Sequence, residues 1–501
     1  MHAIFGTVIK HICKNILWSS GMISKSTAFR HRQVVAQGAG SIKADQWRSQ
    51  IAIYFIALFV GWEVDGEIED VDAARPTDKV RSAALKTQEK LVRERRREHL
   101  LSKYPNTSSA QLDAISTLTM TRSKTKHYDA LVEFTAGVRI ISSHSISPNE
   151  IKRGCGFIQS AIQKWAEMNA HLVPYFHFTA IHLEKQLLKH GPIPNWWTYQ
   201  YERNNGRLGR FNHNGHSGGE LECTMMRGWW KMTKIRELLT RLESIVDPAE
   251  EDLDSIQLLK KELRGGTSER MGTLQSFIAR AHVNKNTGNF PLFLLFVHVN
   301  MSTDKLQFPR FSQEFVLRSL SDGTYNTVFN FLRKCWEGKV VLRTDLALLA
   351  SRSELSFIGN IRSFSHLWVE RRRYGASTHA RGQNAQYAYM DHRVPVQIQY
   401  LFKIDRTHPV TQEALRATCA RVRRFKPPKT PREFPWQIWS VDIGVDVWQA
   451  NKFEHWEIID VNRLSGHFIL APLTLDDEEL WATIAFDHDA PEEDVDMYNN
   501  D

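Results

Sequence analysis

The densest concentration of chemically active side chains lies between residues 191 and 230. This segment reads GPIPNWWTYQYERNNGRLGRFNHNGHSGGELECTMMRGWW, and its Trp, Asn, His, Gly and Arg residues follow little helical or strand periodicity. A polyanion contact uses such residues, because guanidinium groups bind phosphate oxygens and glycine allows close approach of the backbone. The composition therefore predicts that residues 191–222 form an irregular but ordered surface segment that contacts its own backbone or a polyanion.

The histidines and tryptophans of this part of the chain have structural alternatives. His213 and His216 have a spacing that suits a metal, but no further His or Cys cluster supports zinc, so loop-stabilising hydrogen bonds are the favoured interpretation. His177 and His182 lie in a helical pattern and are expected in the core or at a helix cap. Paired tryptophans can stack on bases but usually belong to a core. A core position is expected for Trp196, Trp197, Trp229 and Trp230.

A second basic stretch lies at residues 416–432, which hold seven Lys or Arg residues and no acidic residue. The prolines at its end disfavour a helix and predict an extended backbone. Two interpretations stay open, a flexible loop that touches a phosphate backbone and a solvated linker. Under the first, the nucleic-acid-binding residues are Arg423, Arg424 and Lys426.

Two other charged stretches carry hypotheses. Residues 476–501 hold eleven acidic residues and no Lys or Arg. We expect residues 490–501 to compete with nucleic acid for the basic stretch, as a weak and salt-sensitive autoinhibitor. The run Arg93–Arg97 is typical of a solvated helix face, with a phosphate contact or nuclear import as the alternative.

Helical periodicity dominates the first half of the chain. Residues 43–62 begin polar and become apolar, which predicts a buried helix, and residues 79–103 mix Lys, Arg and Glu, which predicts an exposed helix with salt bridges. Ser147 before Pro148 predicts a helix start, with breaks at Pro174 and near Gly191. Apolar spacing also predicts helices within 127–142, 150–190, 223–246 and 253–282.

Alternation replaces helical spacing beyond residue 355, as in Val394–Ile404 and His467–Leu475, and predicts short strands. The expected fold class is α+β, a helical N-terminal half followed by a small β-rich domain that could be a barrel. Its aromatic residues could line a groove or form the core, and both interpretations stay open for Phe434, Trp436, Trp439 and Trp448. The expected divisions are a poorly defined segment 1–42, a mostly helical region 43–290, a connecting region 291–360, a β-rich domain 361–489 and an acidic tail 490–501.

Composition bounds the class of protein. The 501 residues are 42% hydrophobic, enough for a real core in two or three domains, and the net charge of +9 favours a polyanionic partner such as DNA or RNA. The five scattered cysteines argue against a disulfide framework, and the longest apolar run, Ile51–Trp62, is too short to span a bilayer. Residues 1–44 hold no acidic residue, as in a transit peptide, although a start codon assigned inside a longer reading frame is the favoured explanation.

Several separated motifs occur in order along the chain: KADQWR at 43–48, SISPNE at 145–150, PYFH at 174–177, NWWTYQYER at 195–203, HFILAP at 467–472 and WATIAFDH at 481–488. Together they resemble the C-terminal part of fungal CACTA-type DNA transposases, downstream of most of the catalytic core. The resemblance covers roughly residues 38–490. It implies an RNase H-like cut-and-paste transposase, in which three carboxylates hold two Mg²⁺ ions.

The resemblance assigns the third carboxylate to Glu202, as the catalytic residue and metal ligand of this chain. Arg203, Arg207 and Arg210 are then expected beside scissile phosphates as nucleic-acid-binding residues. For Glu202 the alternative is a capping role or an ion pair with a neighbouring arginine. No upstream Asp carries the flanking His motif of the family, so the chain is expected to hold no metal alone, with Mg²⁺ bound in the parent family.

These observations predict a transposon-derived, nuclear, DNA-associated protein that is not active alone in strand cleavage and transfer. One alternative is a non-enzymatic DNA- or chromatin-binding module retained from a transposon, and another is a functionless fragment. The expected partners are DNA and, through self-association, another copy or a full-length transposase. No membrane partner is expected.

Overall fold

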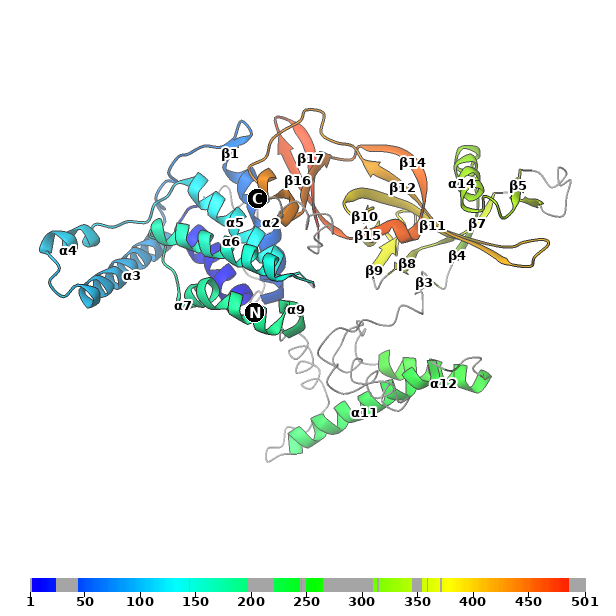
Figure 1. Ribbon diagram of the computed structural model, residues 1–501, viewed down its shortest axis with the longest axis horizontal. Coiled ribbons are helices and arrows are strands. Elements are labelled where there is room, and N and C mark those ends of the chain that lie inside the picture. The colour runs from blue at the N-terminus through cyan, green and yellow to red at the C-terminus, as the bar shows by residue number, and fades with distance from the viewer. Residues whose placement is uncertain are drawn as a thin grey trace. The chain divides into compact units, whose positions relative to one another are not determined.

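The computed structural model describes residues 2–23, 44–143, 145–196, 220–243, 245, 249–264, 310–312, 315–344, 354–357, 359–369 and 372–485. The chain divides into two compact units. The smaller unit comprises Ile193–Asp304 together with Met1, and the larger comprises His2–Pro192 and Lys305–Asp501. The fold class is α+β, with helices dominating the N-terminal half and strands concentrated from residue 310 onward, as the periodicity predicted (Figure 1).

The first part of the larger unit, residues 2–192, is called the helical region below. It contains the π-helices η1 (His2–Ile9), η2 (Ile12–Ser19) and η3 (Phe178–His182), and the α-helices α2 (Ala44–Trp62), α3 (Lys79–Lys103), α4 (Ser109–Ser116), α5 (Lys124–Ile141), α6 (Pro148–Glu167), α7 (Pro174–His177) and α8 (Leu183–His190). A short ribbon of β1 (Glu63–Val64) and β2 (Glu67–Ile68) follows α2.

Residues 2–23, for which the sequence predicted no defined structure, are helical and buried. Phe5, Ile9, Ile12 and Leu17 have no exposed surface, and η1 contacts α2. The predicted buried helix over 43–62 is confirmed as α2, where Phe55 and Phe59 are fully buried. Burial of these apolar side chains makes the segment part of the hydrophobic core.

The centre of the helical region is the pair α5 and α6, whose backbones approach closely at two glycines. A Cβ at Gly137 would lie 2.6 Å from the carbonyl oxygen of Gly154 and 2.7 Å from Ile158, and a Cβ at Gly154 would lie 2.9 Å from Ile140. Only glycine therefore fits at this crossing. The predicted start of α6 is confirmed, because Ser147 caps the helix with Glu150 as a reciprocal partner and Pro148 in the first turn.

The later breaks are also confirmed: α7 begins at Pro174, and α8 ends at His190 before Gly191, which has a positive φ of 75°. His177 and His182 lie at helix caps, one of the two positions expected for them, because His177 precedes η3 and His182 precedes α8. Both are exposed on the same side of η3, with ring centroids 5.3 Å apart. The π-helical turn brings residues five apart into register, which the α-helical spacing did not predict.

The predicted exposed helix over 79–103 is confirmed as α3, with ion pairs between Lys90 and Glu94 and between Arg93 and Glu89. Its arginine run is mostly exposed, as predicted for a solvated face, but three of its side chains also contact the protein. These side chains hold neighbouring segments by donating to backbone carbonyls: Arg93 to Leu118 at 2.8 Å, Arg95 to Leu172 at 2.5 Å and Arg96 to Ala166 at 2.9 Å.

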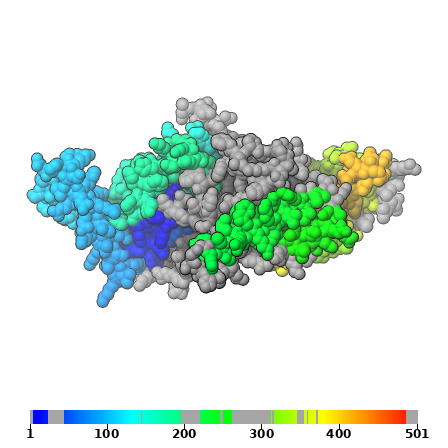
Figure 2. Space-filling view, turned by 90° about the horizontal axis from the view of Figure 1, so that it is seen from below, coloured from blue at the N-terminus to red at the C-terminus, as the bar shows by residue number. Residues whose placement is uncertain are grey.

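The smaller unit is described over α9 (Ile193–Trp196), α11 (Glu220–Glu243) and α12 (Glu250–Arg264). Helices were predicted here, and α11 and α12 contact each other, with Lys260 pairing with Glu243 at 2.7 Å (Figure 2, green). The expected core position of Trp230 is wrong, because this side chain is 46% exposed. Its ring instead packs edge-on against Trp229, with centroids 5.5 Å apart.

The β-rich part belongs to the larger unit and is built on a seven-stranded sheet. Its strands are β4 (Phe315–Ser319), β7 (Asn360–Phe364), β10 (Tyr387–Met390), β11 (Val394–Thr407), β12 (Ala414–Phe425), β14 (Phe453–Asp460) and β15 (Leu464–Gly466). Smaller sheets contain β13 (Val445–Gln449), β16 (Phe468–Leu475) and β17 (Glu478–Ala485), then β3 (Arg310–Phe311), β8 (His366–Val369) and β9 (Arg372–Gly375), and finally β5 (Val341–Arg343) and β6 (Glu354–Ser356).

No barrel closes among the described strands. The order β14-β12-β11-β10-β15 has two ends, and β11 pairs with β7 as well as with β10 along its second edge. The long hairpin of β11 and β12 therefore forms the centre of a branched sheet (Figure 1). The described strands thus form an open sheet, so the expectation of a barrel is corrected.

Each face of this sheet has its own core. Helix α14 (Asp322–Cys335) covers part of one face, where Val328 and Leu332 pack on Phe402 and Cys419. On the opposite face, Ile398, Val422 and Ile459 belong to a second buried cluster.

The four aromatic residues near the end of the chain are not equivalent. Trp436 is 1% exposed and packs edge-on against Phe55 and Phe59 of α2, with centroids 5.6 and 5.0 Å apart. Phe434 stacks on Trp436, and Trp439 packs on Phe157 of α6. A core role therefore holds for Trp436, in the contact between the helical region and the segment that leads to α15 (Ser440–Ile443).

Candidate nucleic-acid interface

The residues assigned through the transposase resemblance fall outside the described residues. These are Glu202, Arg203, Arg207 and Arg210, together with His213 and His216 of the same segment. The predicted catalytic and metal-ligating role of Glu202 therefore stays a prediction. The site that can be built from side-chain geometry lies on the second basic stretch.

Residues 416–425 form most of strand β12, so the basic stretch begins inside the sheet. The predicted extended backbone is confirmed there, but the interpretations as a flexible loop or a solvated linker are wrong for these residues. β12 pairs with β11 along one edge and with β14 along the other. Pairing on both edges fixes which arginines share a face, because alternate side chains of a strand point the same way.

Arg421 and Arg423 share one face of β12, and a β-bulge in β11 sets their neighbours. The register places Gln397 opposite Arg423 and Tyr400 opposite Arg421, with Gln399 as the extra residue. Without this bulge Gln399 would lie opposite Arg421, so the bulge replaces an amide by an aromatic ring. On the other edge, Trp456 of β14 lies opposite Arg423.

We call the resulting surface the arginine–aromatic face, and we define it by Arg318, Tyr400, Arg421, Arg423, Phe453 and Trp456, all of which are partly exposed. The guanidinium carbon of Arg423 lies 3.8 Å from the ring centroid of Phe453 and 4.6 Å from that of Trp456. That of Arg421 lies 4.9 Å from Trp456 and 5.9 Å from Tyr400. Arg318 of β4 adds a third guanidinium, 5.1 Å from the Tyr400 ring.

The polar partners of these arginines are neutral amides. Arg423 donates through Nε and Nη2 to Oε1 of Gln397 at 2.9 and 2.7 Å, and Arg421 donates through Nη1 to Oε1 of Gln399. Within the described part of the chain, no ion pair includes Arg318, Arg421 or Arg423. The Nε of Arg318 is buried and has no hydrogen-bond partner among the described residues.

Burial lowers the pKa of the Arg421 and Arg423 guanidinium groups, because each cation has lost part of its hydration. Both nevertheless stay protonated near neutral pH, since arginine is a very weak acid. The face thus holds partly desolvated positive charge that no carboxylate of the described residues balances. An anion that reached it would gain charge-assisted hydrogen bonds at little cost in side-chain ordering.

The remaining basic residues of 416–432 differ from this pair. Arg424 forms a two-pronged ion pair with Glu457, at 2.6 and 3.2 Å, which raises the pKa of Arg424. Glu457 lies opposite Val422, whose side chain is buried beneath the other face. Arg432 pairs with Asp476 at 2.6 Å and Glu478 at 3.6 Å, within the start of the acidic stretch. Residues 490–501, the predicted autoinhibitor, lie outside the described residues.

Lys426 follows β12, and its backbone pairs with Lys452 at 3.1 Å and with Gln449 at 2.9 Å. Its side chain is partly exposed. The structure therefore separates the three predicted residues of this stretch. Arg423 lies in the arginine–aromatic face, Arg424 is charge-balanced within the chain, and Lys426 lies beyond the end of the strand.

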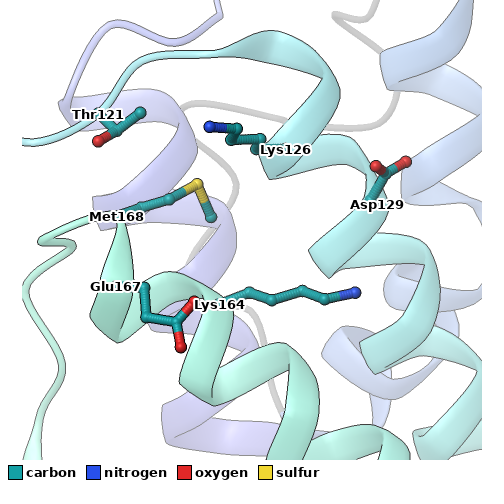
Figure 3. Close-up of a pocket in the computed structure, with 6 residues that line it drawn as sticks. All are labelled: Thr121, Lys126, Asp129, Lys164, Glu167 and Met168. Carbon is teal, nitrogen blue, oxygen red and sulfur yellow. The ribbon is translucent and has the colours of Figure 1, made fainter.

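A pocket of about 290 Å³ lies at the ends of α5 and α6, lined by Thr121, Lys126, Asp129, Lys164, Glu167 and Met168 (Figure 3). Lys164 donates to Glu133 at 2.7 Å, and burial raises the pKa of Asp129. Figure 3 shows Lys164 extending to the side on which Asp129 lies. The lining thus holds two lysines and two carboxyl groups, and this balance of charge gives the pocket little attraction for an ionic ligand.

The described part of the chain does not meet the requirements of two other classes of site. No group of three or more His, Cys, Asp or Glu residues there could hold a metal ion. No helix there is long and apolar enough to cross a membrane. Its five cysteines are all unpaired thiols.

Of the residues of this face, Arg423 was predicted from the sequence, whereas Arg318, Arg421, Tyr400 and Trp456 were not. A signal for Arg421 was present, because RVR at 421–423 places two arginines two residues apart on one face of a strand. The other residues come from strands far apart in the sequence, and Tyr400 reaches this face only through the bulge. No local pattern encodes such a pairing.

No family model, curated protein or solved structure matches the chain.

Proposed function

We propose that this chain is a non-enzymatic nucleic-acid-binding protein, retained from a transposon, which contacts the phosphate backbone through its arginine–aromatic face. The observation that supports the proposal most is the set of partners around Arg421 and Arg423. Both guanidinium groups rest on aromatic rings and amide oxygens, and neither is paired with a carboxylate in the described part of the chain. Nucleic acid is the abundant polyanion that such a surface fits.

The transposon origin is part of the same proposal and is supported by the ordered motifs from KADQWR to WATIAFDH. DNA as the partner and the nucleus as the location follow from that origin. The proposal assigns the chain no strand cleavage by itself, because only one metal-binding carboxylate, Glu202, is attributed to it and two Mg²⁺ ions need more. Under this proposal Mg²⁺ belongs to the parent family.

The test compares two double variants of the same strand that carry the same change of charge. R421Q/R423Q removes two cations of the face, and R416Q/R424Q removes two cations that face Asp405 at 3.9 Å and Glu457 at 2.6 Å. Fluorescence anisotropy with labelled single-stranded and duplex oligonucleotides measures Kd for the full chain at several salt concentrations. Circular dichroism confirms that each variant is folded.

We expect R421Q/R423Q to weaken binding at least about tenfold near 100 mM salt and to lower the salt slope by about two. R416Q/R424Q should stay within about threefold of the wild type, since each lost cation was already balanced. Equal losses in the two variants would show that only overall charge matters. A wild-type chain that binds no oligonucleotide would refute the proposal.

A further inference from the structure

The arginine–aromatic face has a second property beside its charge, because its rings are arranged in rows across the sheet. Tyr387 of β10, Gln397 of β11, Arg423 of β12 and Trp456 of β14 lie side by side in register. Tyr400 and Arg421 form a second row, two residues further along β12 and therefore about 6–7 Å away. Each of these two arginines thus has an aromatic ring beside it on a neighbouring strand, Trp456 for Arg423 and Tyr400 for Arg421.

Trp456 is placed so that part of its surface stays open. The guanidinium groups of Arg421 and Arg423 approach its ring from the β12 side. In the described sheet β14 is an outer strand, so no further strand covers the other side of this ring. Tyr400 is also partly exposed and contacts guanidinium groups from Arg318 and Arg421.

We propose that this face binds single-stranded nucleic acid, with unpaired bases stacking on Trp456 and Tyr400 while Arg318, Arg421 and Arg423 contact the phosphates. This inference rests on the proposed function and narrows it. In a duplex the faces of the bases are stacked on one another, so a ring on a sheet cannot reach them. A single strand can lay its bases on such rings, and interleaved arginines then meet the backbone.

The same geometry indicates weak sequence preference. Gln397 accepts from Arg423 and donates through Nε2 to Gln386 Oε1 at 2.7 Å, so its amide is used within the protein. Gln399 accepts from Arg421. Reading a base edge needs free donors and acceptors, whereas stacking needs only a π face, which every base has.

The experiment measures the affinity of the full-length wild-type chain for four probes of equal length, of which the three single strands also carry the same number of phosphates. They are a mixed-sequence single-stranded DNA, the same sequence as RNA, an abasic strand that keeps the phosphates but lacks the bases, and the duplex. We expect both base-containing single strands to bind at least about tenfold more tightly than the abasic strand and the duplex. The DNA and RNA arms show which of the two sugars the face prefers.

Two tryptophan variants test whether the bases stack on Trp456. Trp456→Leu should weaken single-strand binding by about 5- to 100-fold and leave the weaker duplex binding nearly unchanged. Trp230→Leu is the matched control, because Trp230 is 46% exposed but belongs to α11 of the smaller unit and not to the sheet that carries the arginines. We expect no change in this variant.

The outcomes separate this inference from the proposed function. If abasic and base-containing strands bind equally, or the duplex binds best, the stacking inference is wrong, while a loss in R421Q/R423Q still supports phosphate binding. If Trp230→Leu weakens single-strand binding and Trp456→Leu does not, the stacking inference for the arginine–aromatic face is also wrong, and the stacking site lies on α11. Absence of binding to every probe overturns both.

Discussion

The helical region and the arginine–aromatic face use arginine in opposite ways. Arg122 is 4% exposed and donates to the backbone carbonyls of Ala73 at 2.7 Å, Ser20 at 2.9 Å and Ala74 at 2.7 Å. Arg423 donates to the amide oxygen of Gln397 and rests on two aromatic rings. The same guanidinium group therefore stabilises the fold where backbone carbonyls surround it, and it is available to a ligand where amides and aromatic rings surround it.

The difference follows from what each region leaves unsatisfied. In the helical region, helix ends and connecting segments expose carbonyl groups, and the long arginine side chains of α3 satisfy them. In the sheet, backbone carbonyls are already paired with neighbouring strands, so arginines on its face find side chains only. Positive charge is therefore used for folding in the first region and stays available to a ligand in the second.

The largest expected effect is on stability in the helical region. Arg122→Ala should lower the free energy of unfolding by about 3–5 kcal/mol, because three carbonyls lose a charged donor at once. Arg421→Ala, the matched change on the sheet, should cost about 1 kcal/mol or less. Urea denaturation followed by circular dichroism measures both. Similar costs for the two variants would remove the distinction between folding and ligand-binding arginines.

The next effect is a loss of stability in acid. Burial lowers the pKa of His127 from 6.5 to about 4, and its ring contacts the carbonyl of Thr121 at 2.9 Å. Below pH 6.5 the unfolded chain binds a proton at His127, whereas the folded chain binds it only below about pH 4. The free energy of unfolding therefore falls by about 3 kcal/mol as the pH decreases through this window. His11 and His171, whose pKa values burial also lowers, act in the same direction.

Denaturation midpoints between pH 4 and pH 7 test this, and His127→Gln should flatten the dependence while His11 and His171 keep part of it. The arginines of the arginine–aromatic face contribute nothing to the change in stability between pH 4 and pH 7, since they keep their charge throughout this range. If the denaturation midpoint of His127→Gln depends on pH as strongly as that of the wild type, groups other than His127 cause the loss of stability in acid.

The smallest effect concerns packing. Gly137→Ala should destabilise the chain by about 1–3 kcal/mol, because the new methyl group meets the Gly154 carbonyl and Ile158. Gly156→Ala, at an exposed position of α6 with nothing within 4 Å of its Cβ, should instead stabilise by about 0.5–1 kcal/mol. Thermal unfolding of both variants measures the difference. Neither change should alter nucleic-acid affinity, and a loss of binding in Gly137→Ala would connect the two regions.

Much of the fold was predictable because its signals are local. Ser147 and Pro148 mark a helix start by their own hydrogen-bonding and backbone preferences, and α6 begins there. Alternation in Val394–Ile404 marks a strand for a similar reason, and β11 contains it. The predictions for Trp230 and the barrel were wrong because a solvent-facing tryptophan and an open, branched sheet depend on what packs nearby.

The sequence by itself determined the fold class, the positions of the main helices and the positive charge of residues 416–432. It also holds the ordered motifs on which the transposon hypothesis rests. The tertiary structure decided which of those charges stay open. Arg423 and Arg424 are adjacent in the chain, yet one lies among rings and amides and the other beside Glu457. That separation comes from strand pairing and from the bulge at Gln399, because side chains distant in sequence become neighbours only when strands come into register.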